Sequence, residues 1–133
     1  MDKVVHFEIP FDDKERAMKF YKENFGWGMN DLGPKMGDYV LAQTAKTDKD
    51  MMVEDKGAIN GALYSRGVEK VKEPIVVIQV DSIDETIKKV ERSGGKLITA
   101  KMPIPNGSYA RVADSEGNVI GIIDSSKSEY KPE

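Results

Sequence analysis

The most constraining feature of this sequence is that its two halves follow the same plan. In each half an apolar run precedes an acidic residue, a helical pattern follows, and glycine closes it. The corresponding pairs are His6 and Ile75, Asp12 and Asp81, and Gly26 and Gly95. The members of every pair lie 69 residues apart. A constant offset of this kind predicts two similar modules rather than a chance likeness.

The first module opens with a strand and a helix. Residues 4–9 alternate around a period of two, which predicts a strand that ends at Pro10. Asp12, followed by Glu15 three residues on, predicts a helix N-terminus, and Gly26 predicts its end. The residues that recur at helical spacing between them are Ala17, Phe20, Tyr21, Asn24 and Phe25.

The second module repeats this opening. Pro74 precedes an apolar strand over residues 75–80, and Ser82 with Glu85 forms a capping box. The predicted helix carries an apolar stripe and is closed by Gly94-Gly95. The stripe consists of Ile83, Ile87 and Val90.

Three further strands are expected after each helix. They cover residues 27–32, 39–44 and about 58–65 in the first half, and 96–101, 108–113 and 119–124 in the second. The predicted fold class is therefore α+β. One domain over residues 1–133 contains two βαβββ modules, at about 3–66 and 73–124. We expect a mobile loop at about 45–57 and a polar, fraying tail at 125–133.

Alternation assigns the two faces of each sheet. The apolar residues of the opening strands should meet their own helix, which turns His6 and Glu8 to the opposite face. The members of the helix-facing set are Val5, Phe7 and Ile9, and Val76, Ile78 and Val80. A mixed sheet with helices on its outer face only can curl into a cup. Such a cup is where a small ligand is expected to bind.

Composition excludes several classes of protein. Twenty Lys and Arg residues against 23 Asp and Glu residues leave a net charge of −3, which excludes a strongly basic nucleic-acid binder. No apolar run is long enough to cross a membrane, and the first residues do not form a signal peptide. Cysteine is absent, so disulfides and thiolate chemistry are excluded. We therefore expect a cytoplasmic protein.

Histidine limits the possible chemistry further. The chain contains a single histidine, His6, so no site can take two imidazoles from one chain. A Ser-His-Asp triad is possible by composition. It is not favoured, because no serine stands on a sharp, glycine-flanked turn.

At this point the pattern resembles the glyoxalase, bleomycin-resistance and extradiol-dioxygenase group, the vicinal oxygen chelate superfamily. The resemblance covers essentially the whole chain. In the first half it rests on residues 6–10, 12–21, 25–27 and 57–61, and in the second on residues 80–84, 94–96 and 114–118. It implies two βαβββ modules forming a cup-shaped sheet, usually within a homodimer. Metal-dependent members hold one divalent ion in the cup through four ligands, typically His and Glu.

The resemblance implies a poor metal site in this chain. The family's metal-ligand position on the first strand corresponds to His6 in the first module. The same position in the second module corresponds to Ile75. The final-strand position matches Gly121, and the remaining one falls near Asn60 or Gly61. Neither Ile nor Gly has a side chain that binds metal. We therefore predict no resident metal or other cofactor.

Metal binding has three remaining routes. Glu8 could ligate beside His6, Glu54 could swing in from the loop, and a partner chain could supply ligands. In each of these alternatives the chain would hold one divalent ion, with His6 as a ligand.

Seven residues are candidates for contacting a ligand. They are His6, Glu8, Trp27, Tyr39, Asn60, Tyr109 and Arg111. His6 and Glu8 are also the candidates for proton transfer, although each has an ordinary structural interpretation. Tyr109 and Arg111 share one strand face, which suits an anionic or aromatic ligand.

Three functions remain open from the sequence. The first is a homodimeric protein that binds a small organic molecule and has largely lost the metal site. The second is a metal-dependent lyase, isomerase or dioxygenase acting on an oxygen-rich substrate. The third is a non-catalytic interaction domain whose cup is filled by its own side chains.

Overall fold

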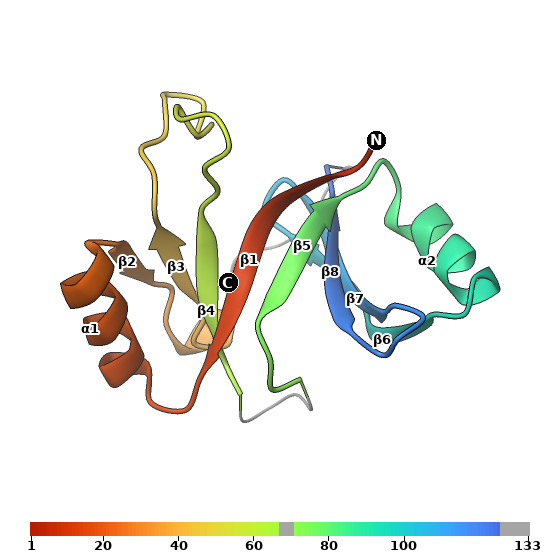
Figure 1. Cartoon of the computed structure of the whole chain (residues 1–133), viewed down its shortest axis with the longest axis horizontal. Helices are drawn as coiled ribbons and strands as arrows, with labels where there is room; N and C mark the ends of the chain where they lie inside the picture. The colour runs from red at the N-terminus through yellow and green to blue at the C-terminus, as the bar shows by residue number, and fades with distance from the viewer. Residues whose placement is uncertain (67–70, 126–133) are drawn as a thin grey trace. The chain divides into compact units, whose positions relative to one another are not determined.

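The computed structural model describes residues 1–66 and 71–125 and contains two compact units. The first unit runs from His6 to Pro74, and the second joins Met1–Val5 to the chain from Ile75 onward. Each unit combines four strands with one α-helix (Figure 1). The predicted tail lies outside the described residues, apart from Ser125.

The first unit follows the order strand, helix, strand, strand, strand. Its elements are β1 (Lys3–Phe11), α1 (Lys14–Phe25), β2 (Gly28–Asp31), the short 3-10 helix η1 (Pro34–Met36), β3 (Val40–Gln43) and β4 (Gly61–Ser65). Across the sheet the strands lie in the order β2-β3-β4-β1. β1 runs parallel to β4, and the other neighbours are antiparallel.

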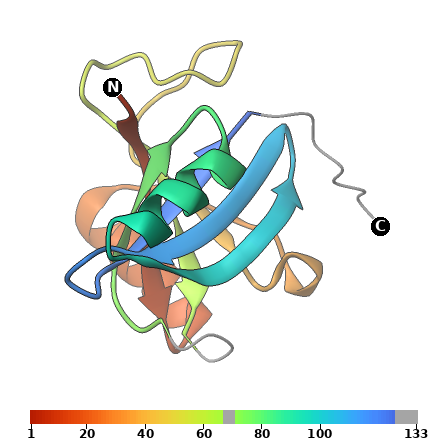
Figure 2. The ribbon, with the colours of Figure 1, turned by 90° about the vertical axis from the view of Figure 1, so that its right-hand side faces the viewer.

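The second unit repeats this arrangement. Its elements are β5 (Ile75–Gln79), α2 (Ile83–Arg92), β6 (Lys96–Ile104), β7 (Gly107–Ala113) and β8 (Val119–Asp124). The strand order is β5-β8-β7-β6, with β5 parallel to β8 and the other pairs antiparallel. Figure 2 shows α2 lying across the strands of this unit.

The start of the chain differs from the prediction in two details. β1 continues through Pro10 to Phe11 and stays in register with β4. Proline is tolerated near a strand end when its missing N–H would not face the neighbouring strand. The N-cap of α1 is Asp13 rather than Asp12, because an Asp13 carboxylate oxygen accepts from the backbone N–H of Arg16 at 3.0 Å. Asp12 instead pairs with Arg66.

The buried face of α1 is narrower than the sequence suggests. Ala17, Met18 and Tyr21 pack against a core of Phe11, Val40 and Leu63. The helical spacing of Phe20 and Phe25 suggests that they share this buried face, but they are 53% and 61% exposed. Their rings contact each other and the neighbouring aromatic residues instead.

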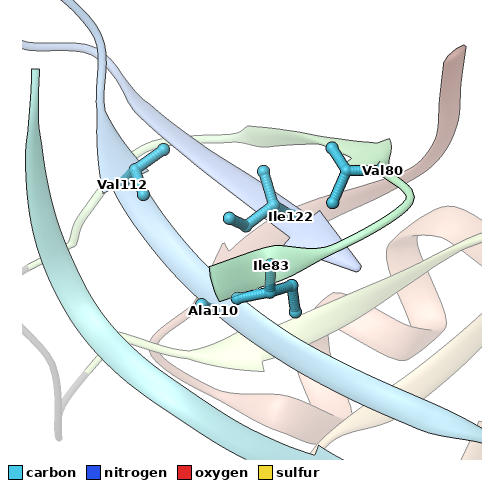
Figure 3. Close-up of a cluster of buried hydrophobic side chains, with 5 residues drawn as sticks. All are labelled: Val80, Ile83, Ala110, Val112 and Ile122. Atoms are coloured by element: carbon cyan, nitrogen blue, oxygen red, sulfur yellow. The ribbon is translucent and has the colours of Figure 1, made fainter. Parts of the chain in front are cut away.

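The core of the second unit follows the predicted pattern closely. Val80, Ile83, Ala110, Val112 and Ile122 form a buried cluster (Figure 3), against which Ile78, Ile87 and Val90 pack. The predicted cap is present, since the Ser82 hydroxyl accepts from the backbone N–H of Glu85 at 3.2 Å. Val76 is an exception among the predicted core residues, because it is 44% exposed.

The segment between β3 and β4 has internal structure. Thr47 and Val53 form an isolated β-bridge, and the backbone N–H of Asp48 donates to the carbonyl of Met52 at 2.8 Å. Met51 and Met52 at its tip are 77% and 64% exposed. The segment is therefore a hairpin-like excursion, and its mobility stays a prediction.

The α+β fold class is confirmed, with the βαβββ order present twice. No helix in the described part of the chain is long and apolar enough to cross a membrane.

Candidate functional site

Each unit has a sheet face opposite its helix, which we call its open face. In the first unit the register places Glu8, Ala62 and Leu41 side by side on this face. In the second unit Val77, Gly121 and Arg111 are aligned in the same way. Since Glu8 and Val77 are 69 residues apart, these two rows are structurally equivalent.

The same equivalence between the two units extends to other residues of the open faces. His6 and Ile75 lie two residues before Glu8 and Val77, and Tyr39 and Tyr109 lie two residues before Leu41 and Arg111. The two tyrosines form the one identical pair among these positions. Sequence spacing alone missed this equivalence, because the connections between the later strands differ in length.

The His6 ring has two hydrogen-bond partners. Its Nε2 lies 2.9 Å from the hydroxyl of Tyr39, and the ring also hydrogen-bonds the backbone of Asn60. Burial lowers the pKa of His6 below its usual value, against the opposing effects of the Glu8 charge and the Asn60 hydrogen bond. His6 is therefore neutral at pH 7.

Tyr39 is placed by the turn that leads into β3. Its backbone carbonyl accepts from Leu32 at 3.0 Å, and its N–H donates to Met36 at 3.2 Å. The preceding Asp38 pairs with Lys14 of α1 at 3.2 Å. Tyr39 is half-buried, and these backbone contacts hold it where its hydroxyl reaches His6.

Glu8 is the most deeply buried charged residue on the open face of the first unit. It is 1% exposed, and it is engaged in interactions within the molecule. Its nearness to His6 is seen in the upward effect of its charge on the His6 pKa. On this face Glu8 is therefore buried, whereas Tyr39 and His6 are half-buried.

Tyr109 and Arg111 form a pair in the second unit. The Arg111 Nε–H donates to the Tyr109 hydroxyl at 2.8 Å, and the guanidinium carbon lies 5.7 Å from the centre of the Tyr109 ring. Arg111 is 5% exposed and has further interactions within the molecule, whereas Tyr109 is half-buried. The predicted shared face of these two residues is therefore present.

The residues at the chelate positions do not fit a divalent metal. Ile75 is buried and apolar, and a Cβ at Gly121 would lie 3.0 Å from both the Tyr109 hydroxyl and Val77 Cγ2. Because Ala62 is the register equivalent of Gly121, it occupies the fourth position, for which the sequence offered Asn60 or Gly61. Three of the four positions thus have no side chain that can bind metal.

The alternative donors do not complete such a site. Among residues 1–66 and 71–125, no group of three His, Asp or Glu side chains is arranged to hold a metal ion. The Asn60 side-chain oxygen accepts from the backbone N–H groups of Thr44 and Ala45 at 2.8 and 2.9 Å, so it closes the end of β3. His6 Nε2 faces Tyr39.

Trp27 lies away from His6. Its ring stacks on Tyr21 at 4.9 Å and contacts Phe7 at 5.5 Å, on the helix side of the first unit. The Phe7 ring in turn lies over Gly61, where a Cβ would come within 2.4 Å of it. The structure therefore brings His6, Tyr39 and Asn60 together and separates Trp27 from them.

Comparison with known proteins identifies relatives of the chain. Residues 3–45 match the family model described as bleomycin resistance protein-like N-terminal. A glyoxylase-like domain-containing protein from Didymella fabae is 31% identical over 123 residues, which cover 86% of this chain and 88% of that protein.

Solved structures share the fold at low sequence identity. Methylmalonyl-CoA epimerase from Mycobacterium tuberculosis is similar with a TM-score of 0.63 at 13% identity, over 92% of this chain and 87% of that one. A glyoxalase/bleomycin resistance protein/dioxygenase superfamily member from Vibrio splendidus 12B01 has a TM-score of 0.59 at 12% identity, over 93% and 99%. A Streptomyces coelicolor methylmalonyl-CoA epimerase variant in complex with 2-nitronate-propionyl-CoA has a TM-score of 0.64 at 12% identity, over 94% and 98%.

Proposed function

This chain belongs to the glyoxalase, bleomycin-resistance and extradiol-dioxygenase superfamily, and on that premise we propose that it binds a small organic ligand without a divalent metal ion. The ligand contacts are assigned to the open faces, where His6, Tyr39 and Tyr109 are half-buried. A protein of the same fold is known in complex with a CoA-linked small molecule, which supports an organic ligand for this fold.

The observation that carries the proposal is the chemistry of the chelate positions. Ile75, Ala62 and Gly121 offer no donor atoms, and the Tyr109 hydroxyl and Val77 crowd the space beside Gly121. One imidazole does not hold a catalytic transition metal, because three protein ligands are the usual minimum. Nothing in the structure of residues 1–66 and 71–125 favours the metal-dependent enzyme or the interaction domain over a ligand-binding protein.

Equilibrium dialysis against Ni²⁺, Zn²⁺ or Mn²⁺ tests the metal half of this proposal. We expect the wild type and His6→Gln to retain equal, substoichiometric amounts of each ion. Retention of one ion per chain by the wild type, with loss in His6→Gln, would show that His6 anchors a working metal site. The tag must be removed first, because oligohistidine binds these ions.

We also propose that the protein is a cytoplasmic homodimer. The absence of cysteine fits a reducing compartment, and pairing with a second copy is a common way to cover exposed strand edges. Light scattering after size exclusion checks the dimer against the monomer mass of 14.8 kDa. A monomer at all concentrations would contradict it.

A further inference from the structure

We propose that the outer edge of β2, together with the groove between β2 and α1, is the surface on which a second copy of this chain docks. In such a dimer the two β2 strands pair antiparallel about a twofold axis. This inference rests on the homodimer proposed above and names its contact surface. It is carried by the outward backbone groups of β2, by two methionines in the groove and by the charges along α1.

β2 is the last strand of its sheet, so one of its two backbone edges has no neighbouring strand. The contact just after the strand shows which residues lie on that edge. The backbone N–H of Leu32 donates to the carbonyl of Tyr39 at 3.0 Å, so Leu32 faces the β3 side. Because backbone groups alternate along a strand, Asn30 also faces β3, whereas Met29 and Asp31 face outward. The edge therefore offers an N–H and a C=O from each of these two residues.

The sheet of the second unit ends in β6, and that edge is less suited to strand pairing. Its register with β7 shifts between Leu97 and Thr99 and again between Thr99 and Met102, and the strand contains Pro103. Bulges and proline disrupt the regular backbone spacing that a pairing strand needs. β2 keeps a continuous register with β3 over its whole length and contains no proline. Of these two outer strands, β2 is therefore the one suited to accept a further strand.

A groove lies beside this edge, between β2 and α1 (Figure 1). Met18 and Met29 are its half-buried members, and its exposed members are charged. The charged residues are Glu15, Lys19, Lys22 and Glu23. Methionine adapts its shape to a partner and is enriched in protein interfaces. A second copy would bring the same two methionines to this groove and remove apolar surface from water.

The charges along the groove are self-complementary. Lys19 pairs with Glu23 at 3.8 Å, whereas Glu15 and Lys22 take part in no ion pair within residues 1–66 and 71–125. Glu15 and Lys22 are separated by about two helical turns, or about 10 Å along α1. A twofold axis reverses the direction of the helix, so it brings Glu15 of each copy to Lys22 of the other. Two favourable contacts form in each dimer.

Charge reversal tests this interface in the full chain. Analytical ultracentrifugation measures the dissociation constant of the dimer for the wild type, Glu15→Lys, Lys22→Glu and the double variant. Each single reversal should raise this constant about tenfold or more, because both symmetric contacts change from attraction to repulsion. The double variant should return to within about threefold of the wild type, since it exchanges the two charges and keeps their complementarity.

Arg16→Glu is the matched control. Arg16 is exposed on α1 but does not line the groove, and its reversal changes the net charge by the same amount as Lys22→Glu. The dissociation constant of Arg16→Glu should equal that of the wild type. Single reversals that behave like Arg16→Glu would overturn the inference. So would a double variant that dimerises more weakly than either single variant.

Amide hydrogen exchange on the wild type covers the case in which the reversals unfold α1. The N–H groups of Met29 and Asp31 should exchange more slowly at high protein concentration, where the dimer is populated. The N–H of Asn30, which faces β3, should be insensitive to concentration. Exchange at Met29 and Asp31 that does not depend on concentration would overturn the inference.

The outcomes separate this interface from the homodimer itself. A dimer that persists unchanged in every variant leaves the proposed homodimer standing and removes only the β2 interface. A monomer at all concentrations removes both.

Discussion

The burial of His6 predicts how the stability of this protein depends on pH. Its folded pKa lies below the unfolded value of 6.5, mainly because burial disfavours the charged ring. The unfolded chain therefore binds this proton more readily than the folded chain does. Stability contributed by neutral His6 is complete above the unfolded pKa and is lost as the pH falls toward the folded pKa, below which it stays level.

The size of this effect has a physical ceiling. One titrating group changes the free energy of unfolding by at most about 1.4 kcal/mol per pH unit. In the window between pH 7 and pH 5, His6 is the only side chain of the sequence whose ordinary pKa lies inside the window. Asp31 and Asp114 titrate below this window, since their hydrogen bonds from Lys14 and Asn118 respectively lower their pKa values further.

Urea unfolding at several pH values measures the effect directly. The wild type should lose stability between pH 7 and pH 5, and His6→Gln should show a flatter profile. NMR titration of the His6 signal should give the same folded pKa as the unfolding data. A wild-type profile that is flat, or that gains stability as the pH falls, would refute the account of His6 as a buried neutral ring.

The remaining predictions concern packing and hydrogen bonding in the second unit, with a control position in the first. Gly107→Ala places a Cβ 1.9 Å from the backbone oxygen of Asp124, and we expect it to cost at least about 1–3 kcal/mol by chemical denaturation. Gly28→Ala, whose Cβ meets nothing closer than 3.4 Å, should be nearly neutral, and equal effects would contradict the packing argument. Asp124→Ala removes the acceptor of the buried Ile83 N–H at 2.8 Å, so we expect a loss of about 1–3 kcal/mol, measured as a lower melting temperature. An unchanged melting temperature would show that water or another group replaces the carboxylate.

Much of the fold could be predicted from local patterns. The offset of 69 residues, the cap at Ser82 and the glycine at position 26 indicated the module plan, because capping and periodicity act over a few residues. The same local reasoning failed at Phe20 and Phe25, whose helical spacing suggested burial. Which part of an apolar stripe is covered depends on the sheet beneath it, and that is a tertiary property.

The candidate site was harder to predict, since its central contact joins residues 33 positions apart. The sequence proposed His6 and Tyr39 separately, and only strand register shows that Tyr39 is the counterpart of Tyr109. Register also placed Ala62 at the position for which spacing allowed Asn60 or Gly61. Trp27 was proposed as a ligand contact, but it lies on the helix side of its unit, against Phe7. The sequence could not decide this, because an aromatic residue near the start of a strand is compatible with either face of a sheet.

Native mass spectrometry of the untagged protein, purified without chelators, tests the central claim most directly. It reports bound metal and any co-purifying organic molecule in the same spectrum. We expect a metal-free protein. Any mass above that of the polypeptide should be that of an organic molecule, either one that co-purifies or one that is added. One divalent ion per chain, retained through buffer exchange and lost in His6→Gln, would contradict it.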